Sequence, residues 1–185
     1  AGEFVKYIEN DFETFGFEPD SDASKAAKNK ISKATILDNI NVIEDKSVDA
    51  ITLWHVFEHI ENQDEMLEIF NNKLKEKGLL IIAVPNPTSY DAKHYKEYWA
   101  AYDVPRHIYH FSKIGMENLI AKKPNWKMRK IKPLVLDSYY ISMLSEKYKK
   151  SPLFWLKATV YGTISNVKAI FSNEFSSLIY IIEKK

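Results

Sequence analysis

Three ionisable side chains follow one apolar stretch in the segment DAITLWHVFEHI, residues 49–60. The first half of this segment is typical of a buried strand, and the second half carries His55, Glu58 and His59. In open α/β sheets, ligands bind where the parallel strands end. Histidine is the usual general base near neutral pH. We therefore predict a site after this strand, with His55 and His59 as candidate catalytic bases and Glu58 in contact with the substrate.

The neighbouring elements predict a unit that would position these side chains. The run GLLIIAVPN, residues 78–86, is a second apolar strand and ends in Asn86, a candidate substrate contact. Between the two strands, apolar residues at helical spacing predict a helix over 62–77 that ends at Gly78. Two strands joined by a helix form a βαβ unit, so the side chains that follow both strands are expected at one edge of the sheet.

The rest of the chain alternates between helical and strand patterns. Helices are expected over residues 2–10, 21–30, 113–122, 137–150 and 151–172, and further strands over 14–17, 33–37, 126–136 and 177–182. This order predicts one α/β domain over residues 1–185, with a mostly parallel sheet and an antiparallel last strand. Because the sequence starts beside a helix with no strand before it, we expect that the chain is cut inside a motif and lacks its first strand.

The segment 87–111 is rich in tyrosine, histidine and tryptophan and has no clear periodicity. Such a segment after a strand is a probable substrate lid, and a well-packed surface loop is the alternative. An imidazole could reach the reaction centre from the lid, aromatic rings could stack on an acceptor, and a guanidinium could pair with an anionic group. The candidates are the catalytic residue His107 and the substrate contacts Tyr98, Trp99, Tyr102, Arg106, Tyr109 and His110.

Composition excludes several classes of protein. The 185 residues carry a net charge of +1, so no global field favours nucleic acid. The chain has no cysteine, which excludes disulfides, thiolate catalysis and zinc–thiolate sites within it. With no signal-peptide pattern and no apolar run long enough to span a membrane, a cytoplasmic protein is expected.

The predicted helix 151–172 has an apolar stripe at helical spacing. Such a stripe could contact a membrane peripherally or bind a partner. Packing on the sheet is favoured here, because the polar face of the helix is only weakly basic.

Glu18 directly follows the predicted strand 14–17. An acidic residue at such a strand end can accept hydrogen bonds from both hydroxyls of a nucleotide ribose. A solvated carboxylate is an equally good interpretation of Glu18 alone. Gly2 lies sixteen residues earlier, where a glycine-rich nucleotide-binding turn would end, and this spacing favours the nucleotide.

A series of short motifs follows the order that is typical of a known protein family. GEF, GFEP, ILDN, VDAITLWHVFEHI and LKEKGLLIIAVPN follow one another, and WAAYDVPRHIYHF precedes the sixth strand of the expected fold. This series resembles the class I S-adenosylmethionine-dependent methyltransferases, in particular the branch with ubiquinone-type O-methyltransferases and other type 11/23-like members. The resemblance covers nearly the whole chain and implies a Rossmann-like three-layer sandwich. EKG stands where the family usually has PGG.

The resemblance also implies a cofactor, S-adenosylmethionine, and residues that bind it. Ala1 and Gly2 match the end of the cofactor loop, and Glu18, followed by Pro19, matches the acid that binds the ribose. The adenine positions correspond to Asp38, Asn39 and Ile40, and the wall beside the sulfonium to Leu53, Trp54 and His55. The acceptor would be a small molecule or a lipid-linked compound, with O-methylation favoured.

Other functions remain compatible with the same residues. Glu18 would equally suit the ribose of NAD in an oxidoreductase, and a degenerate domain could serve only as an interaction module. If the chain turns helical after Trp54, then His55, Glu58 and His59 share one face and could hold a divalent ion. Ubiquinone-type relatives have an acidic residue at the position of His55, so we expect no metal here.

Overall fold

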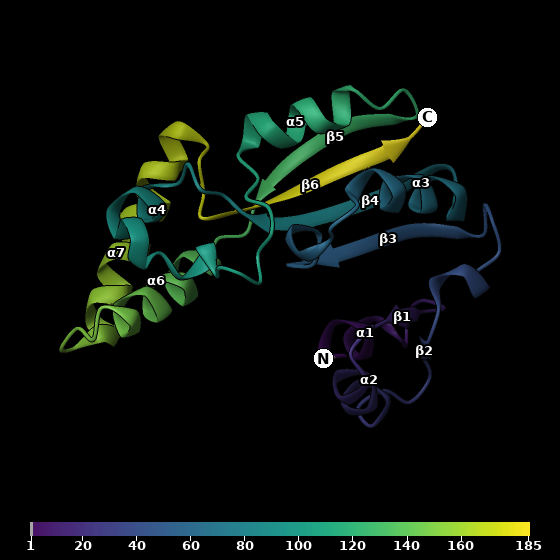
Figure 1. The fold of residues 1–185 in the computed structure, drawn as a ribbon, viewed down its shortest axis with the longest axis horizontal. Coiled ribbons are helices and arrows are strands. Elements are labelled where there is room, and N and C mark those ends of the chain that lie inside the picture. The colour runs from purple at the N-terminus through teal and green to yellow at the C-terminus, as the bar shows by residue number, and fades with distance from the viewer. Residues whose placement is uncertain (1) are drawn as a thin grey trace. The chain divides into compact units, whose positions relative to one another are not determined.

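The computed structural model describes residues 2–185, and the chain divides into two compact units, residues 1–44 and 45–185 (Figure 1). Ala1, which was matched to the end of the cofactor loop, lies outside the described residues. We expected one domain. Two units arise because the strands form two separate sheets, one with two strands and one with four, and no strand of residues 2–185 joins them.

The first unit is a small α/β layer. It contains α1 (Glu3–Ile8), β1 (Phe15–Phe17), α2 (Ser21–Lys28), β2 (Thr35–Leu37) and the 3-10 turn η1 (Ile40–Val42). β1 and β2 pair in parallel, with Phe17 opposite Leu37. Asp20 caps α2 by accepting hydrogen bonds from two backbone N–H groups of the first turn.

A carboxylate holds this unit together. Glu9, at the end of α1, accepts hydrogen bonds from the backbone N–H groups of Ser32, Lys33 and Ala34, at 2.8–3.2 Å. These backbone hydrogen bonds stabilise the charged form and lower the pKa of Glu9 to about 2. The loop that leads into β2 is therefore fixed on α1.

The second unit is built on a four-stranded sheet in the order β3-β4-β6-β5. Its strands are β3 (Val48–Trp54), β4 (Leu74–Pro85), β5 (Trp126–Pro133) and β6 (Ser177–Lys184). β3 and β4 are parallel, whereas β6 runs antiparallel to both of its neighbours. The expected mostly parallel sheet with an antiparallel last strand is confirmed. β3 lies at one edge, and of its apolar residues only Leu53 is buried.

Two helices pack on this sheet, α3 (Gln63–Lys73) on β4 and α5 (Lys113–Ala121) on β5. α3 buries Leu67 and Phe70, and Asn62 caps its first turn. We expected this helix to continue to Lys77. It ends at Lys73 because Leu74 instead pairs with Val48 and begins the long strand β4.

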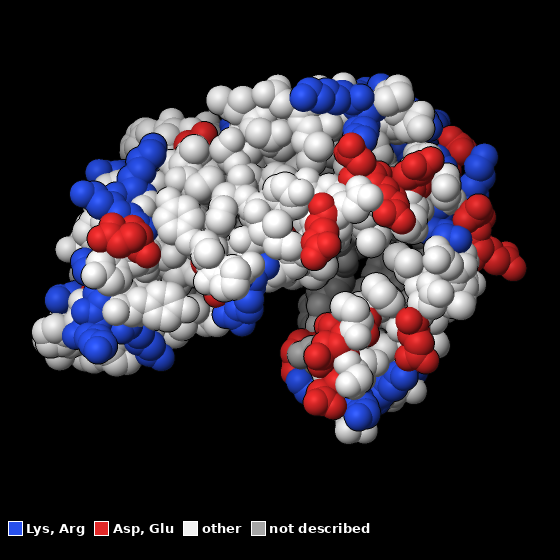
Figure 2. Space-filling model, viewed as in Figure 1, with Lys and Arg blue, Asp and Glu red and all other residues white. Residues whose placement is uncertain are grey.

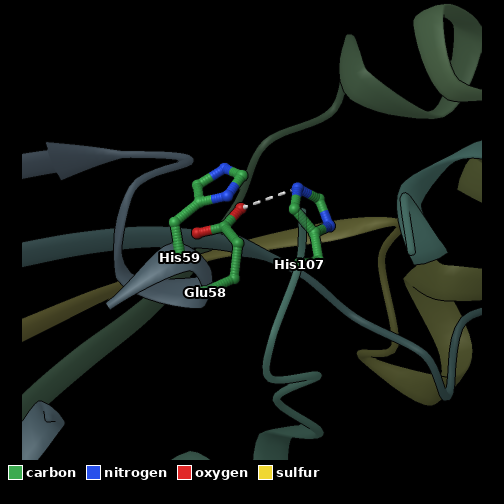
Figure 3. Close-up of side chains that lie close together, drawn as sticks. All are labelled: Glu58, His59 and His107. Carbon is green, nitrogen blue, oxygen red and sulfur yellow. Dashed lines mark ion pairs between the residues drawn. The ribbon is translucent and has the colours of Figure 1, made fainter. Parts of the chain in front are cut away.

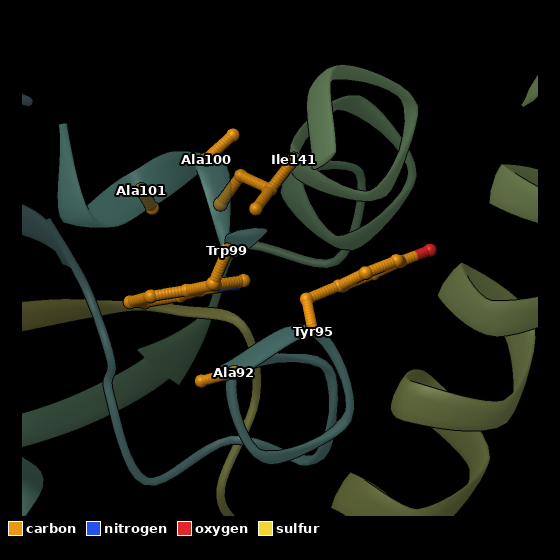
Figure 4. Close-up of a cluster of buried hydrophobic side chains, with 6 residues drawn as sticks. All are labelled: Ala92, Tyr95, Trp99, Ala100, Ala101 and Ile141. Atoms are coloured by element: carbon orange, nitrogen blue, oxygen red, sulfur yellow. The ribbon is translucent and has the colours of Figure 1, made fainter. Parts of the chain in front are cut away.

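The other helices form a separate cluster beside the end of the sheet (Figure 1). They are α4 (Tyr90–Tyr95), α6 (Asp137–Tyr148) and α7 (Phe154–Ser172), with the 3-10 turns η3 (Lys96–Tyr98) and η4 (Ala100–Tyr102) between α4 and α6. Figure 4 shows their core, in which Tyr95 and Trp99 lie among small side chains and Ile141 of α6. The side chains of Tyr95 and Trp99 are therefore part of a core and cannot move as a lid, whereas Tyr98 between them is exposed.

α7 packs with the face opposite to the one expected. Its buried residues are small or polar, namely Ala158, Gly162, Ser165, Asn166 and Ala169, and they face α6 and α4. At Gly162 an added Cβ would lie 2.7 Å from a ring carbon of Tyr139, so the two helices approach as closely as glycine permits. The apolar stripe is exposed. The expectation that it packs on the sheet is wrong.

A buried carboxylate joins three distant segments within this cluster. Asp91 is fully buried and accepts hydrogen bonds from the indole N–H of Trp99 at 2.8 Å, from the hydroxyl of Ser165 at 2.7 Å and from that of Ser176 at 2.6 Å. Three donors compensate the desolvation of this carboxylate.

Among residues 2–185, no helix has both the length and the apolar character that spanning a membrane requires.

Candidate active site

A sharp turn follows β3. His55 has a left-handed backbone conformation, with φ of 53°, and the 3-10 turn η2 (Phe57–His59) follows. The chain therefore does not continue as a helix after Trp54. Because His55, Glu58 and His59 do not share a helical face, the alternative of a metal site on such a face has no support here.

His55 is held by two carboxyl groups. Its Nε2 lies 2.8 Å from an oxygen of Asp137, at the start of α6, and its Nδ1 lies 3.4 Å from Oε1 of Glu58. Burial lowers the pKa of His55, but the hydrogen bond and the charge of Asp137, together with Glu58, outweigh burial and raise it to about 9. His55 is therefore protonated at neutral pH and cannot serve as the predicted base.

Glu58 lies at the centre of the site (Figure 3). Its side chain is 1% exposed. Its backbone carbonyl accepts hydrogen bonds from the N–H groups of Ile108 and Tyr109, so the segment after η4 crosses this turn. Neither carboxyl oxygen of Glu58 has a hydrogen-bond partner among the described residues. A buried carboxyl group that lacks hydrogen bonds is a natural place for a ligand.

Two imidazoles face this carboxyl group with their tautomers fixed. Nδ1 of His59 lies 2.8 Å from the carbonyl oxygen of Arg106, and Nδ1 of His107 lies 2.8 Å from that of Ala101. A carbonyl oxygen only accepts, so each Nδ1 must donate. In the neutral ring, Nε2 then carries the free lone pair. Burial lowers the pKa of His107, which favours this neutral form.

The three side chains are close enough to act together. The rings of His59 and His107 meet edge to face, with their centroids 4.7 Å apart, and Nε2 of His107 lies 3.9 Å from Oε1 of Glu58. One potential ligand atom from each of Glu58, His59 and His107 lies within 4.8 Å of the others. Such an arrangement can accept a proton from a bound molecule, and it could also hold a divalent ion.

Among the other predicted residues of segment 87–111, Trp99 is buried, whereas Tyr98, Tyr109 and His110 lie at the surface. Trp99 is buried and bonded to Asp91, so it has a structural role in place of the expected contact with a substrate. Tyr98 and Tyr109 are partly exposed, and the Tyr109 hydroxyl donates to the carbonyl of Glu61. His110 donates from Nε2 to the carbonyl of Tyr102.

Two more predicted substrate contacts are already engaged. Arg106 has an exposed side chain that pairs with Asp103 at 2.8 Å. Asn86 is fully buried, and its amide donates to the carboxylate of Glu174 and to the carbonyl of Phe175. Asn86 therefore fixes the chain after β4 and offers no surface to a substrate.

In the first unit, the predicted nucleoside contacts follow two paired strands. Glu18 comes directly after Phe17, and Asp38 comes directly after its partner Leu37, so both carboxylates leave the same edge of the sheet. One oxygen of Glu18 accepts from the backbone N–H of Asp20. Asp38 pairs with Lys28 at 3.2 Å.

The remaining predicted cofactor residues flank these positions. Asn39 caps η1 with its side chain, Ile40 is half-buried and Pro19 is exposed. Gly2 has φ of 81°, and an added Cβ would lie 3.0 Å from Cα of Ala27. Only glycine fits there without strain. In the second unit, Leu53 is buried and Trp54 is half-buried at the end of β3.

Sequence reasoning missed the partners that decide the charge state of this site. Asp137 was seen only as the start of a helix, and the carbonyls of Ala101 and Arg106 carry no side-chain signal at all. The sequence shows only that Asp137 is an acidic residue at the start of a predicted helix. This position does not indicate which histidine the carboxyl group would bind.

Comparison with known proteins identifies the family. The family model described as "Methyltransferase domain" matches residues 1–128, more than half of the chain. The chain belongs to this methyltransferase family. Its cofactor is S-adenosylmethionine. The NAD alternative is thereby set aside. Comparison with curated protein sequences gives no match.

Solved structures share the fold of this methyltransferase. A SAM-dependent methyltransferase from Archaeoglobus fulgidus aligns with a TM-score of 0.58 and 17% identity, over 100% of this chain and 81% of the other. The plantazolicin methyltransferase BpumL, solved with SAH and a substrate analogue, aligns at 0.61 and 15%, over 100% and 73%. The cyclase SpnF aligns at 0.64 and 10%, over 99% and 70%. At these identities the likeness extends to the fold alone.

The described residues of the methyltransferase fit the cofactor. Two acidic side chains at adjacent strand ends suit a ribose and its neighbouring base. Gly2 has a left-handed backbone, and its close contact is with Ala27 of α2.

Proposed function

We propose that this methyltransferase transfers the methyl group of S-adenosylmethionine to a small-molecule or lipid-linked acceptor, with oxygen as the favoured acceptor atom. The observation that carries the proposal is the pair of ring nitrogens, Nε2 of His59 and Nε2 of His107, beside the buried carboxyl group of Glu58; in each ring Nδ1 is bonded to a backbone carbonyl. A hydroxyl group must lose its proton when it is methylated. These nitrogens are the groups that can take it.

Within this proposal, the cofactor supplies an electrophilic methyl group when it is bound. Glu18 binds the ribose hydroxyls, while Asp38, Asn39 and Ile40 hold the adenine. Most of the catalysis then comes from positioning, because bringing two reactants into line removes much of the entropic barrier.

His107 is the first candidate for the base. Its ring is neutral at pH 7 because burial lowers its pKa, and its Nδ1–H bond to the Ala101 carbonyl directs Nε2 toward Glu58. His59 is a second acceptor for the same proton, oriented by the carbonyl of Arg106. His55 is excluded from this role. As an imidazolium it balances the negative charge of Asp137 and Glu58.

The acceptor would enter over the exposed part of segment 102–110. Tyr98 and Tyr109 are partly exposed and can stack on an aromatic or unsaturated group. The side chain of Arg106 can exchange its exposed pair with Asp103 for an anionic group of the acceptor, since such a surface pair is weak.

Calorimetric titration with S-adenosylhomocysteine and with NAD tests the cofactor assignment. We expect micromolar binding of the first and none of the second, and a Glu18→Ala variant should bind about 1–3 kcal/mol more weakly because the ribose hydroxyls lose an acceptor. Binding of neither compound would favour the degenerate interaction module and contradict the proposal.

Transfer of a labelled methyl group to phenolic, hydroxylated and lipid-linked acceptors then tests the reaction. Activity that survives dialysis against a chelator would support proton transfer by the histidines. Activity that is lost and then restored by a divalent ion would assign Glu58, His59 and His107 to a metal and contradict their role as bases.

A further inference from the structure

The outward face of α7 is mainly apolar, with the exposed Thr163 between Val160 and Val167. Leu156, Val160, Val167, Ile170 and Phe171 recur at helical spacing, and each is at least 46% exposed, Phe171 reaching 84%. Helices of soluble domains normally bury such a stripe. Here the opposite face packs on α6 and α4, so the stripe has no partner among the described residues. A continuous exposed apolar face of this kind marks an interaction surface.

The turn between α6 and α7 extends this face with aromatic side chains. Tyr148, Leu153 and Trp155 are 54%, 60% and 58% exposed. A groove between the two helices, lined in part by Leu136, Tyr140 and Trp155, opens beside them and is mainly apolar. Tryptophan and tyrosine are enriched where a protein meets the boundary between lipid and water, because their rings are apolar at one end and polar at the other.

Charge defines the partner of this face. From residue 147 to residue 173 the chain contains five lysines and no acidic residue, although the whole protein carries a net charge of only +1. Figure 2 shows blue side chains gathered at the end of the molecule where α6 and α7 meet. The lysines are Lys147, Lys149, Lys150, Lys157 and Lys168. A second copy of the same face would bring like charges together, which disfavours a symmetric dimer.

We propose that α7 and the α6–α7 turn form a peripheral docking surface for a membrane that contains anionic lipids. α7 lies in the plane of the interface, with its apolar stripe among the acyl chains, while Trp155 and Tyr148 sit at the headgroup level. The lysines contact the lipid phosphates. Basic residues beside an exposed apolar helix face are the two components that give stable binding at such an interface. This surface is separate from the proposed catalytic cluster and does not depend on the proposed reaction.

Vesicle flotation with the full chain tests the proposal. We expect binding to vesicles of phosphatidylcholine with one third phosphatidylglycerol, much weaker binding to phosphatidylcholine alone, and a marked loss of binding when the salt concentration is raised. Absence of binding to both vesicles, or equal binding to both, would overturn the proposal. So would a stable dimer in solution whose interface is blocked by substitutions in α7.

Two variants separate the contributions of charge and apolar contact. Lys149→Glu with Lys150→Glu should weaken binding at least about tenfold, because it removes two attractive charges and adds two repulsive ones. Val167→Ser with Phe171→Ser should weaken it to a similar extent by removing apolar contact.

Matched controls lie elsewhere on the surface. Lys127→Glu with Lys130→Glu changes the same charge on exposed positions of β5, and Ile114→Ser changes an exposed apolar residue of α5. These controls should bind as the parent protein does. Equal losses in the controls and in the α7 variants would contradict the assignment to α7. Circular dichroism spectra of all variants verify that each is folded.

Discussion

His55 and His107 approach the same carboxyl group from two regions of the molecule and acquire opposite properties. Both rings lie within 4 Å of Oε1 of Glu58. The pKa of His55 rises to about 9 because Asp137 binds its other nitrogen, whereas burial lowers the pKa of His107, whose other nitrogen donates to a neutral carbonyl. The second partner of His55 is a carboxylate that favours the charged ring, whereas the second partner of His107 is a neutral carbonyl, and burial there favours the neutral ring.

Replacing His107 should have the largest effect. In His107→Asn the side-chain amide can still donate to the Ala101 carbonyl, but the Nε2 lone pair is lost. We expect kcat to fall about 10²–10⁴-fold, with unchanged affinity for S-adenosylhomocysteine, because only proton transfer is removed. Kinetics and calorimetry measure the two effects. His94→Gln is the control, because the His94 ring stacks on Tyr161 and does not belong to the group formed by Glu58, His59 and His107. A comparable loss of turnover in this control would contradict the role of His107.

Replacing Glu58, whose carboxyl group lies beside both His55 and His107, should lower the stability of the protein and the pKa of His55. Glu58→Gln keeps the shape of the side chain but leaves the His55 imidazolium with Asp137 alone. We expect the free energy of unfolding at pH 7 to fall by about 1 kcal/mol, less than for a buried ion pair that is broken completely, because Asp137 still balances the imidazolium. Urea unfolding measures this change. The pKa of His55, followed by NMR, should drop below its parent value, and an unchanged pKa would show that Asp137 alone determines it.

The pH dependence of stability should reveal His55. Its folded pKa is raised from an ordinary value of 6.5 to about 9. The ion pair is thus fully stabilising below about pH 6.5, and its contribution is lost as the pH rises through 9. Thermal unfolding across this range measures the loss. Asp137→Asn should flatten the dependence, whereas Asp64→Asn, in an exposed pair with Lys123, should leave it intact. A steep dependence that persists in Asp137→Asn would contradict this assignment.

The smallest effect is expected at Arg106, where backbone and side chain have different roles. The carbonyl orients His59, and the guanidinium makes an exposed pair with Asp103. Arg106→Ala keeps the carbonyl, so stability should change by less than about 1 kcal/mol and kcat should stay close to that of the parent. KM should rise for an anionic acceptor only. A large fall in kcat with a neutral acceptor would show that the guanidinium acts within the site.

Much of the fold followed from apolar patterns, because strands buried on both faces and helices with capping residues leave clear signals. β4, β6 and α5 are examples. The end of α3 was misplaced because Leu74 satisfies both the helical spacing and the strand pattern. Its ladder partner Val48 decides the outcome, and that pairing is not visible in the sequence.

The convergence of the candidate site residues could be predicted, but their charge states could not. His59, Glu58 and His107 converge as expected of residues after a strand and in the following segment. Asp137 belongs to a later helix, and only the folded chain brings it to His55. The face of α7 was misassigned for a related reason. Periodicity locates a stripe, but close packing at Gly162 and Ala158 determines which side is buried.

The hydrogen bonds of Asp91 couple the motions of two segments of the chain. One carboxylate binds Trp99, which precedes the segment that carries His107, and Ser165, which lies on α7. Separating either segment from the other would leave buried polar groups without partners. The two segments should therefore open together as one cooperative unit, and amide hydrogen exchange would show equal protection for both. The helix that carries the apolar stripe and the segment that carries His107 thus share a single folding equilibrium.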